Sequence, residues 1–221
     1  MAHATPPLNP AALPHPILLA AGAGQRFGHR PKGLIQRQGQ PLIAHLLQAL
    51  ATAGLPPATV VLGHHAERLA AALPAPGQPG AAQVVHNPRP EDGQFHSLHQ
   101  GLNALPPQAD VLVLLCDLPL LDSTGLHAVL QAWAQRAAST QVLVPRVGGQ
   151  RGHPVLFSAA VAQALRQAGP PTAPRDWLAL HPSAGAFFDS TDPQYTADAD
   201  TPEALADLAR RHGLDLQPPP G

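Results

Sequence analysis

One short segment of the chain combines an apolar run with glycines and two cations. Residues 17–28 read Ile-Leu-Leu-Ala-Ala-Gly-Ala-Gly-Gln-Arg-Phe-Gly, and Lys32-Gly33 follow shortly after. Glycines let backbone N–H groups approach a ligand closely and form a concave nest for phosphate oxygens. Arg26 and Lys32 add positive charge beside that nest. The segment predicts a polyphosphate site; the alternative is an ordinary strand-to-helix turn that needs glycine.

The glycine spacing separates this segment from two common phosphate motifs. It is not Gly-x-Gly-x-x-Gly with a later acidic residue for a ribose, as in dinucleotide-binding folds. It is also not Gly-x-x-x-x-Gly-Lys-Ser/Thr, the pattern of P-loop proteins. The nest is therefore expected to hold phosphates in another way.

A second chemical feature is a carboxylate at the end of an apolar strand. Residues 112–119 read Leu-Val-Leu-Leu-Cys-Asp-Leu-Pro. Because ligands in wound α/β sheets bind outside the carboxyl ends of strands, Asp117 is expected to face the crevice beside the glycine-rich loop. A carboxylate there suits Mg²⁺ shared with phosphate oxygens. The alternative role, capping a helix, suits Asp122 better because it directly precedes the next helical run.

These residues must be positioned by a regular scaffold, and the hydrophobic periodicity indicates one. Short apolar runs predict strands at 17–21, 59–62, 82–85 and 111–116, which alternate with helical patterns at 41–53, 67–73, 97–104 and 122–136. Further strands are predicted at 141–145 and 154–157, and helices at 158–167 and 202–212, the last opened by Thr201-Pro202. This alternation is typical of a mainly parallel sheet with helices on both faces, a Rossmann-like α/β fold.

We expect one domain, at residues 16–216. Residues 1–15 contain four prolines without periodicity and are expected to form a disordered arm, and residues 217–221 a frayed tail. The single cysteine excludes a disulfide framework and a multi-cysteine zinc site, and it favours a cytoplasmic location. A net charge of −1 with 12% charged residues argues against nucleic acid as a partner. No apolar run approaches the roughly 18 residues that span a bilayer, so no membrane partner is expected.

Taken together, these motifs resemble those of the MobA-like NTP transferases, and within that family most closely the molybdenum cofactor cytidylyltransferases. The resemblance covers about residues 16–212. It rests first on Leu19, Ala20, Ala21, Gly22, Arg26, Phe27, Gly28 and Lys32. It continues with Asn87-Pro88 leading to Gly93, Ser97 and Gly101, then with Cys116–Pro119, Arg151–Pro154 and Asp198–Glu203. Departures are Gly24, where many relatives have serine, and the absence of a Gly-Asp-x-Gly-Ala-Arg segment between 167 and 181.

The resemblance implies a role for each of these positions. Nucleotide-binding residues would be Leu19, Ala20, Ala21, Gly22, Ala23, Gly24, Arg26, Lys32, Asn87, Ser97 and Gly101. Lys32 and Arg26 would be catalytic. Asp117 and Asp200 would hold Mg²⁺, or alternatively Mn²⁺, with Asp198 as a further candidate because it shares a face of an extended segment with Asp200. Taken alone, either Asp198 or Asp200 could instead cap the last helix.

Two histidine-containing segments remain open to a structural explanation. Arg151-Gly-His153-Pro borders the acceptor pocket in the relatives, and the resemblance implies acceptor binding for Arg151 and His153. The alternative is a turn that requires Gly152 and Pro154 for its geometry. His96 and His99 lack further cysteine or carboxylate ligands, so a chance pair explains them better than zinc.

The implied activity is transfer of a nucleoside monophosphate from an NTP to the phosphate of molybdenum-bound molybdopterin, with release of pyrophosphate. CTP is preferred because Ala21 stands where GTP-using relatives have glycine. A molybdenum hydroxylase, or its chaperone, is the implied protein partner. The alternatives are a transferase that uses GTP or a sugar-phosphate acceptor, and a non-catalytic module that binds the molybdenum cofactor.

Overall fold

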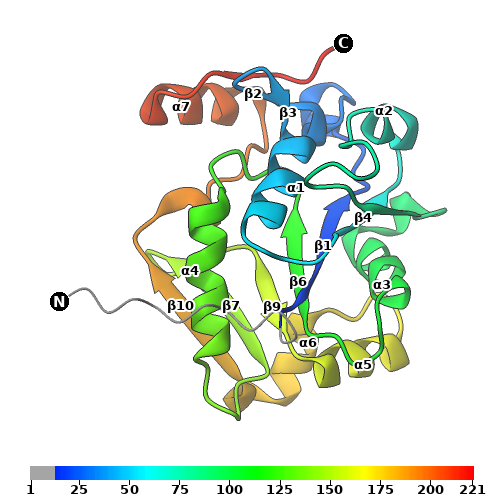
Figure 1. The fold of residues 1–221 in the computed structure, drawn as a ribbon, viewed down its shortest axis with the longest axis vertical. Helices are drawn as coiled ribbons and strands as arrows, with labels where there is room; N and C mark the ends of the chain where they lie inside the picture. The colour runs from blue at the N-terminus through cyan, green and yellow to red at the C-terminus, as the bar shows by residue number, and fades with distance from the viewer. Residues whose placement is uncertain (1–12) are drawn as a thin grey trace.

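An eight-stranded sheet forms the centre of the protein in the computed structural model, which describes residues 13–221 (Figure 1). The strands are β1 (His15–Ala20), β4 (Thr59–Leu62), β5 (Gln83–His86), β6 (Val111–Leu115), β7 (Val142–Val147), β8 (Gln150–Arg151), β9 (Val155–Phe157) and β10 (Gly185–Ser190). Their order is β10-β7-β9-β6-β1-β4-β5, with β8 added beside β7. Only β8 and β9 run antiparallel to their neighbours. The predicted class, a mainly parallel α/β fold, is confirmed.

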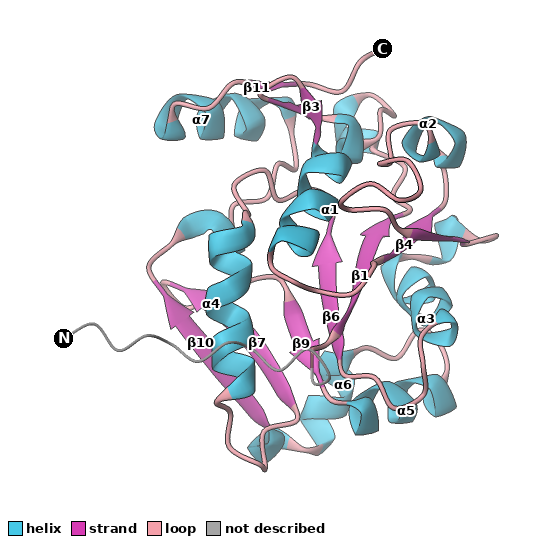
Figure 2. Ribbon diagram, viewed as in Figure 1, coloured by secondary structure: helices cyan, strands magenta, loops and turns pink. Residues whose placement is uncertain are grey.

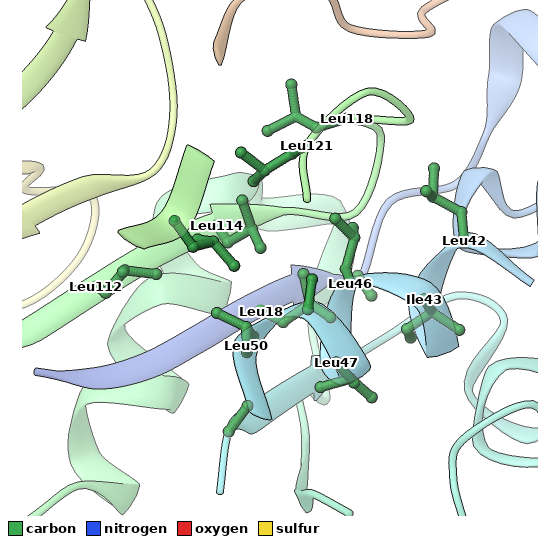
Figure 3. Close-up of a cluster of buried hydrophobic side chains, with 14 of the residues drawn as sticks. Leu18, Leu42, Ile43, Leu46, Leu47, Leu50, Leu112, Leu114, Leu118 and Leu121 are labelled. Carbon is green, nitrogen blue, oxygen red and sulfur yellow. The ribbon is translucent and has the colours of Figure 1, made fainter. Parts of the chain in front are cut away.

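Helices cover both faces of this sheet (Figure 2). They are α1 (Leu42–Thr52), α2 (Ala66–Ala70), α3 (Gln94–Ala104), α4 (Ser123–Ala134), α5 (Ala159–Ala168), α6 (Pro174–Leu180) and α7 (Pro202–His212). Side chains alternate between the faces of a strand, so Leu18 of β1 packs with α1 and α4 while Leu19 packs with α3 and α5. Figure 3 shows leucines of α1 beside Leu18 of β1, in the same cluster as Leu112 and Leu114 of β6. The edge formed by the ends of β1 and β6 is therefore held between two hydrophobic cores.

Helix caps resolve two alternatives that the sequence left open. The Asp122 side chain caps α4 by accepting hydrogen bonds from the N–H groups of Thr124 and Gly125. Thr201 caps α7, accepting from the Ala204 N–H. Asp117 and Asp200 are therefore not needed as caps.

Some elements differ from those that the periodicity predicts. Helix α3 begins at Gln94, three residues before the predicted start at Ser97. Helix α6 and strand β10 were not predicted: α6 is a short helix stabilised by the Asp176 carboxylate accepting from the Ala173 N–H, and β10 is ordered by pairing with β7. Neither has a local pattern long enough to stand out from the surrounding prolines.

The carboxyl-terminal residues form part of a small second sheet. Strand β11 (Leu216–Gln217) pairs with β2 (Gln36–Arg37), which pairs with β3 (Gln40–Pro41). The boundary predicted at Gln217 falls inside this strand, and the guanidinium of Arg30 donates to the Pro219 carbonyl beyond it. Most of the predicted arm, residues 1–12, lies outside the described residues. Within residues 13–221, no helix is long and apolar enough to cross a membrane.

Candidate active site

The glycine-rich loop and Asp117 meet because β1 and β6 are adjacent and parallel. Leu19 pairs with Leu115, so the segments that follow β1 and β6 leave the sheet side by side. Beyond their ends lies a first cavity of about 290 Å³. Its lining is Leu19, Ala20, Ala21, Gly22, Gly24, Pro31, Lys32, Gly33, Leu69, Pro90, Gly93, Gln94, Ser97, Leu115, Cys116 and Asp117.

The structure explains the glycines at positions 24 and 22 of the loop in different ways. Gly24 adopts a positive φ of 63°, and a Cβ there would collide with the backbone carbonyl of Arg30, so the turn itself requires glycine. Gly22 has nothing within 4 Å of an added Cβ and no positive φ. Packing therefore does not demand glycine at position 22, whereas a ligand that must approach the backbone closely would.

Lys32 joins three distant parts of the chain. Its ammonium donates to Asp117 Oδ2 at 2.9 Å and also to Asp200 Oδ1. Arg26, whose side chain is largely exposed, donates to the other oxygen of Asp200. A residue of the loop after β1, a residue just beyond the end of β6 and a residue just before α7 thus form one ion-pair network.

The charged groups of this network shift one another's pKa values. Burial lowers the pKa of Lys32, but the charges of Asp117 and Asp200 and their hydrogen bonds outweigh it, and the pKa is raised. Burial raises the pKa of Asp200, and the hydrogen bonds and charges of Lys32 and Arg26 outweigh that effect, so its pKa is lowered. Asp198 has a raised pKa, first from burial and then from the charge of Asp200. Asp117 and Asp200 are matched by two cations, Lys32 and Arg26, whereas Asp198 has no ion-pair partner among residues 13–221.

One carboxylate oxygen at the centre of the network has no partner. Asp117 Oδ1 is buried and accepts no hydrogen bond from any of residues 13–221. Hard oxygen donors of this kind are what Mg²⁺ and Mn²⁺ prefer, so Asp117 and Asp200 fit such an ion. Among residues 13–221, however, no three acidic, histidine or cysteine side chains are grouped as a ready metal site. The three predicted carboxylates are thus not preassembled, and Mg²⁺ usually takes further ligands from substrate phosphates and water.

Several predicted nucleotide-binding residues lie behind the cavity. Asn87 is buried, donates to the Ser97 hydroxyl and accepts from the Arg89 N–H, so it supports a cavity residue. Gly101 does not line the cavity: an added Cβ would lie 2.8 Å from Ile17 Cγ2, which makes it a packing position between α3 and the sheet. Ala23 is also outside the lining, and its carbonyl accepts a hydrogen bond from His65 Nε2.

A second cavity, of about 400 Å³, adjoins the first. Leu19 and Gln94 line both cavities. Predicted acceptor residues Arg151 and His153 line the second, and burial lowers the pKa of His153. Gly152 between them lies against the Tyr195 carbonyl, where a Cβ would collide, so the turn explanation for this segment also holds.

Sequence reasoning missed other residues of the second cavity. Phe95, Ala173, Pro174, Arg175 and Leu178 line it, from the first turn of α3 and from α6. The only local signal was the Thr-Ala-Pro-Arg-Asp stretch at 172–176, in the region that departs from the family pattern. Among residues 13–221, His96 and His99 belong to no group of three potential metal ligands, and each lies in hydrogen-bond contact with a backbone carbonyl, of Asp92 and Thr172 respectively.

Comparison with known sequences identifies one family. Residues 16–185 match the MobA-like NTP transferase domain. The chain is 37% identical over 118 residues to the bifunctional protein GlmU of Rhodococcus opacus, and this match covers 52% of the chain and 24% of GlmU. It is 40% identical over 122 residues to GlmU of Xanthomonas campestris, covering 53% of the chain and 25% of that protein. The matched segment thus spans about a quarter of the length of these curated relatives.

Solved structures share the fold. Rv0371c from Mycobacterium tuberculosis has a TM-score of 0.68 and 24% identity, covering 90% of this chain and 99% of that one. A nucleotidyl transferase from Methanothermobacter has a TM-score of 0.70 and 22% identity, covering 89% and 96%. A CMP:2-keto-3-deoxy-manno-octonic acid synthetase complexed with CTP has a TM-score of 0.64 and 15% identity, covering 90% and 98%.

Proposed function

This chain belongs to the MobA-like NTP transferase family, and on that basis we propose that it transfers a nucleoside monophosphate from an NTP, preferably CTP, to the phosphate of molybdenum-bound molybdopterin. Pyrophosphate is the second product. The observation that carries the proposal is the Lys32 ammonium bound between Asp117 and Asp200 at the end of β1 and β6. A binding module would not need two carboxylates and a cation at one point, whereas phosphoryl chemistry does.

The proposed reaction is an in-line attack of an acceptor phosphate oxygen on the α-phosphorus of the NTP. The new O–P bond forms as the bond between the α-phosphorus and the bridging oxygen breaks, and that oxygen leaves with pyrophosphate. Because the attacking phosphate is already an anion at neutral pH, the protein needs no general base. Catalysis then consists of positioning the reactants and neutralising charge.

Each residue has a role in that scheme. The open face at Gly22 would admit the triphosphate to the backbone N–H groups, and Arg26 would bind its β- and γ-phosphates. Lys32 would stabilise charge at the α-phosphate. When bound, Mg²⁺ or Mn²⁺ on Asp117 and Asp200 would supply positive charge for the nucleotide and acceptor phosphates. Asp198 is a candidate third carboxylate.

A manganese complex of a protein with this fold supports the proposal that Asp117 and Asp200 bind a divalent cation. One solved structure with this fold is Rv0371c in complex with manganese, with a TM-score of 0.63 and 23% identity, covering 89% of this chain and 97% of that one. In this chain the unpartnered Asp117 Oδ1 is the independent support.

A different acceptor is the second candidate function. The GlmU relatives and the octonic acid synthetase are not named for molybdopterin, and the latter binds CTP. A transferase that uses a sugar phosphate would retain the same first cavity and differ in the second, whereas one that uses GTP would differ in the first cavity, which Ala21 lines.

The deciding experiment is pyrophosphate release measured with each of ATP, CTP, GTP and UTP, against molybdenum cofactor and against a sugar 1-phosphate. We expect release with CTP and molybdenum cofactor, and its loss in Asp117→Asn. Asp207→Asn, a change on α7 at a residue that lines neither cavity, is the matched control and should retain full activity. Release with a sugar phosphate alone would assign the second candidate, and no release with any pair would contradict a transferase.

A further inference from the structure

The second cavity differs in character from the first. Its floor is built of apolar side chains from four strands and from α3, namely Leu19, Leu98, Val113, Val142, Val144 and Val155. Phe95 and Leu178 close its sides. No aspartate or glutamate lines it, and its cations are Arg151 and Arg175. An apolar floor beneath two arginines suits a ligand with an apolar body and an anionic end.

Neither arginine is fully neutralised by a neighbouring carboxylate. Arg151 forms no ion pair with any residue of the described chain, and its guanidinium lies 5.4 Å from the Phe187 ring. Arg175 approaches only Asp176, at 3.6 Å, and that carboxylate already accepts from the Ala173 N–H. Both guanidinium groups therefore retain capacity to bind an anion.

Arg175 is also positioned by an aromatic ring. Its guanidinium carbon lies 4.8 Å from the centre of the Phe95 ring, within the range of a cation–π contact. Phe95 belongs to α3, next to Gln94, which lines both cavities. The pair thus stands at the wall of the second cavity, next to the region where the two cavities adjoin.

We infer that the second cavity selects an acceptor with a flat ring system, whose faces are apolar, and a phosphate group, and that Phe95 and Arg175 are its specificity-determining residues. The inference rests on the proposed function, because it takes the first cavity as the nucleotide site. Phe95 contacts the face of the flat body, and Arg175 binds the phosphate. A sugar phosphate is disfavoured, because its hydroxyl groups would lose water over a floor that offers few hydrogen-bond partners.

The binding of three probe compounds tests the inference about the acceptor, and it requires no catalytic activity. 4-Methylumbelliferyl phosphate has the flat ring and the phosphate, 4-methylumbelliferone has only the ring, and glucose 1-phosphate has only the phosphate. We expect calorimetric titration of the full chain to give about 10-fold tighter binding for the first probe than for either other. Equal or tighter binding of glucose 1-phosphate would overturn the inference.

Variants of Phe95 and Arg175 test whether these two residues cause the tighter binding of the aromatic phosphate. Arg175→Gln should weaken 4-methylumbelliferyl phosphate by about 10-fold and leave 4-methylumbelliferone unchanged, while Phe95→Ala should weaken both aromatic probes. Arg210→Gln, an exposed arginine on α7, is the matched control and should change nothing. Unchanged binding of the aromatic phosphate in both cavity variants would remove these residues from recognition.

A separate titration with CTP and Mg²⁺ distinguishes failure of the acceptor inference from failure of the proposed function. If CTP binds and the aromatic phosphate does not, the acceptor inference is wrong and the proposed function stands. If CTP fails to bind, the proposed function is wrong, whatever the probes show.

Discussion

At the scale of single residues, Lys32 decides how the candidate site is organised. Its side chain is 19% exposed and bridges two carboxylates that lie 85 and 168 residues away. With its pKa raised, the side chain remains an ammonium at neutral pH. In the proposed reaction this cation must exchange some of its contact with Asp117 and Asp200 for contact with phosphate.

Lys32→Ala should therefore lower kcat by about 10²–10³-fold while changing the KM for NTP much less, because an interaction made mainly in the transition state appears in kcat. Steady-state kinetics at saturating acceptor measure both constants. A raised KM with unchanged kcat would mean that Lys32 only anchors the ground-state triphosphate. Wild-type values for both would make it a structural residue.

Ala21 is the residue on which we base the proposed preference for CTP. It is buried, lines the first cavity and lies against Gly63, where an added Cβ would be 2.8 Å from the Ala21 Cβ. Ala21→Gly should move the ratio of kcat/KM for CTP over GTP toward GTP by about 10-fold, since one methyl group is worth about 10–200-fold at most. Ala23→Gly, outside the cavity, is the control. An unchanged ratio would remove Ala21 as a determinant.

At the scale of elements, α3 connects the two cavities to the core. Its first turn supplies Gln94, Phe95 and Ser97 to the cavities, and its middle packs Gly101 against β1 and β4. The position of the first turn depends on how closely the middle approaches the sheet. Gly101 therefore affects the site through packing, which differs from the nucleotide contact that the family resemblance implies.

Gly101→Ala separates these two roles. The added methyl would lie 2.8 Å from Ile17 and 3.1 Å from Val61, so overpacking should cost about 1–3 kcal/mol, against a gain of about 1 kcal/mol in helix propensity. Urea denaturation should show a net loss of stability. Full stability with weakened NTP binding would restore the nucleotide-binding role.

Helix α1 contributes a titratable contact that links it to the loop after β6. His45 Nε2–H donates to the Leu121 carbonyl at 2.9 Å, and Arg37 lies 3.4 Å from Nδ1. Burial, with a smaller effect from the charge of Arg37, lowers the pKa of His45 below its ordinary value, although the Leu121 hydrogen bond opposes this. The folded state therefore binds this proton less well than the unfolded state.

Stability should consequently be complete above the unfolded pKa of about 6.5 and fall as the pH drops through that value. His15 and His153, whose pKa values burial also lowers, act in the same direction. His45→Gln should reduce the loss of unfolding free energy between pH 7 and 5, whereas His212→Gln, exposed at the end of α7, should not. An identical pH slope in the His45 variant would contradict this role.

At the scale of the whole molecule, the site is assembled from three segments that lie far apart in the sequence. The loop after β1, the end of β6 and the segment before α7 meet only when the sheet is complete and α7 is docked. Ligands that bind this assembled site should therefore stabilise the whole fold, because they bind the folded state alone.

Thermal unfolding measures that coupling. CTP with Mg²⁺ at about 100 times its Kd should add about 2.7 kcal/mol, which corresponds to about 5–10 °C in Tm for a chain of this size. Chelation of the metal should remove most of the shift, and Asp117→Asn should remove its Mg²⁺-dependent part. A full shift in the presence of chelator would show that nucleotide binding does not use a metal.

The sequence by itself determined the features that depend on local pattern. Apolar runs located β1, β4 and β6 within two residues, because a buried strand must be continuously apolar, and the residue that follows each run, including Asp117, is placed with it. Asp122 and Thr201 were recognisable as caps because capping depends on a few adjacent residues. The family pattern at residues 19–32 also lies within one such local unit.

Only the tertiary structure decided the relations between distant residues. That Lys32 binds both Asp117 and Asp200, that Gly101 serves packing, and that Arg175 lies over Phe95 all depend on which strands are neighbours and where α6 and α7 dock. Helix α6 is short, and strand β10 alternates exposed with half-buried residues and so has no continuous apolar run; contacts with β7 and the core stabilise them. Local sequence sets local conformation, whereas contacts across 80 to 168 residues arise from burying one shared core.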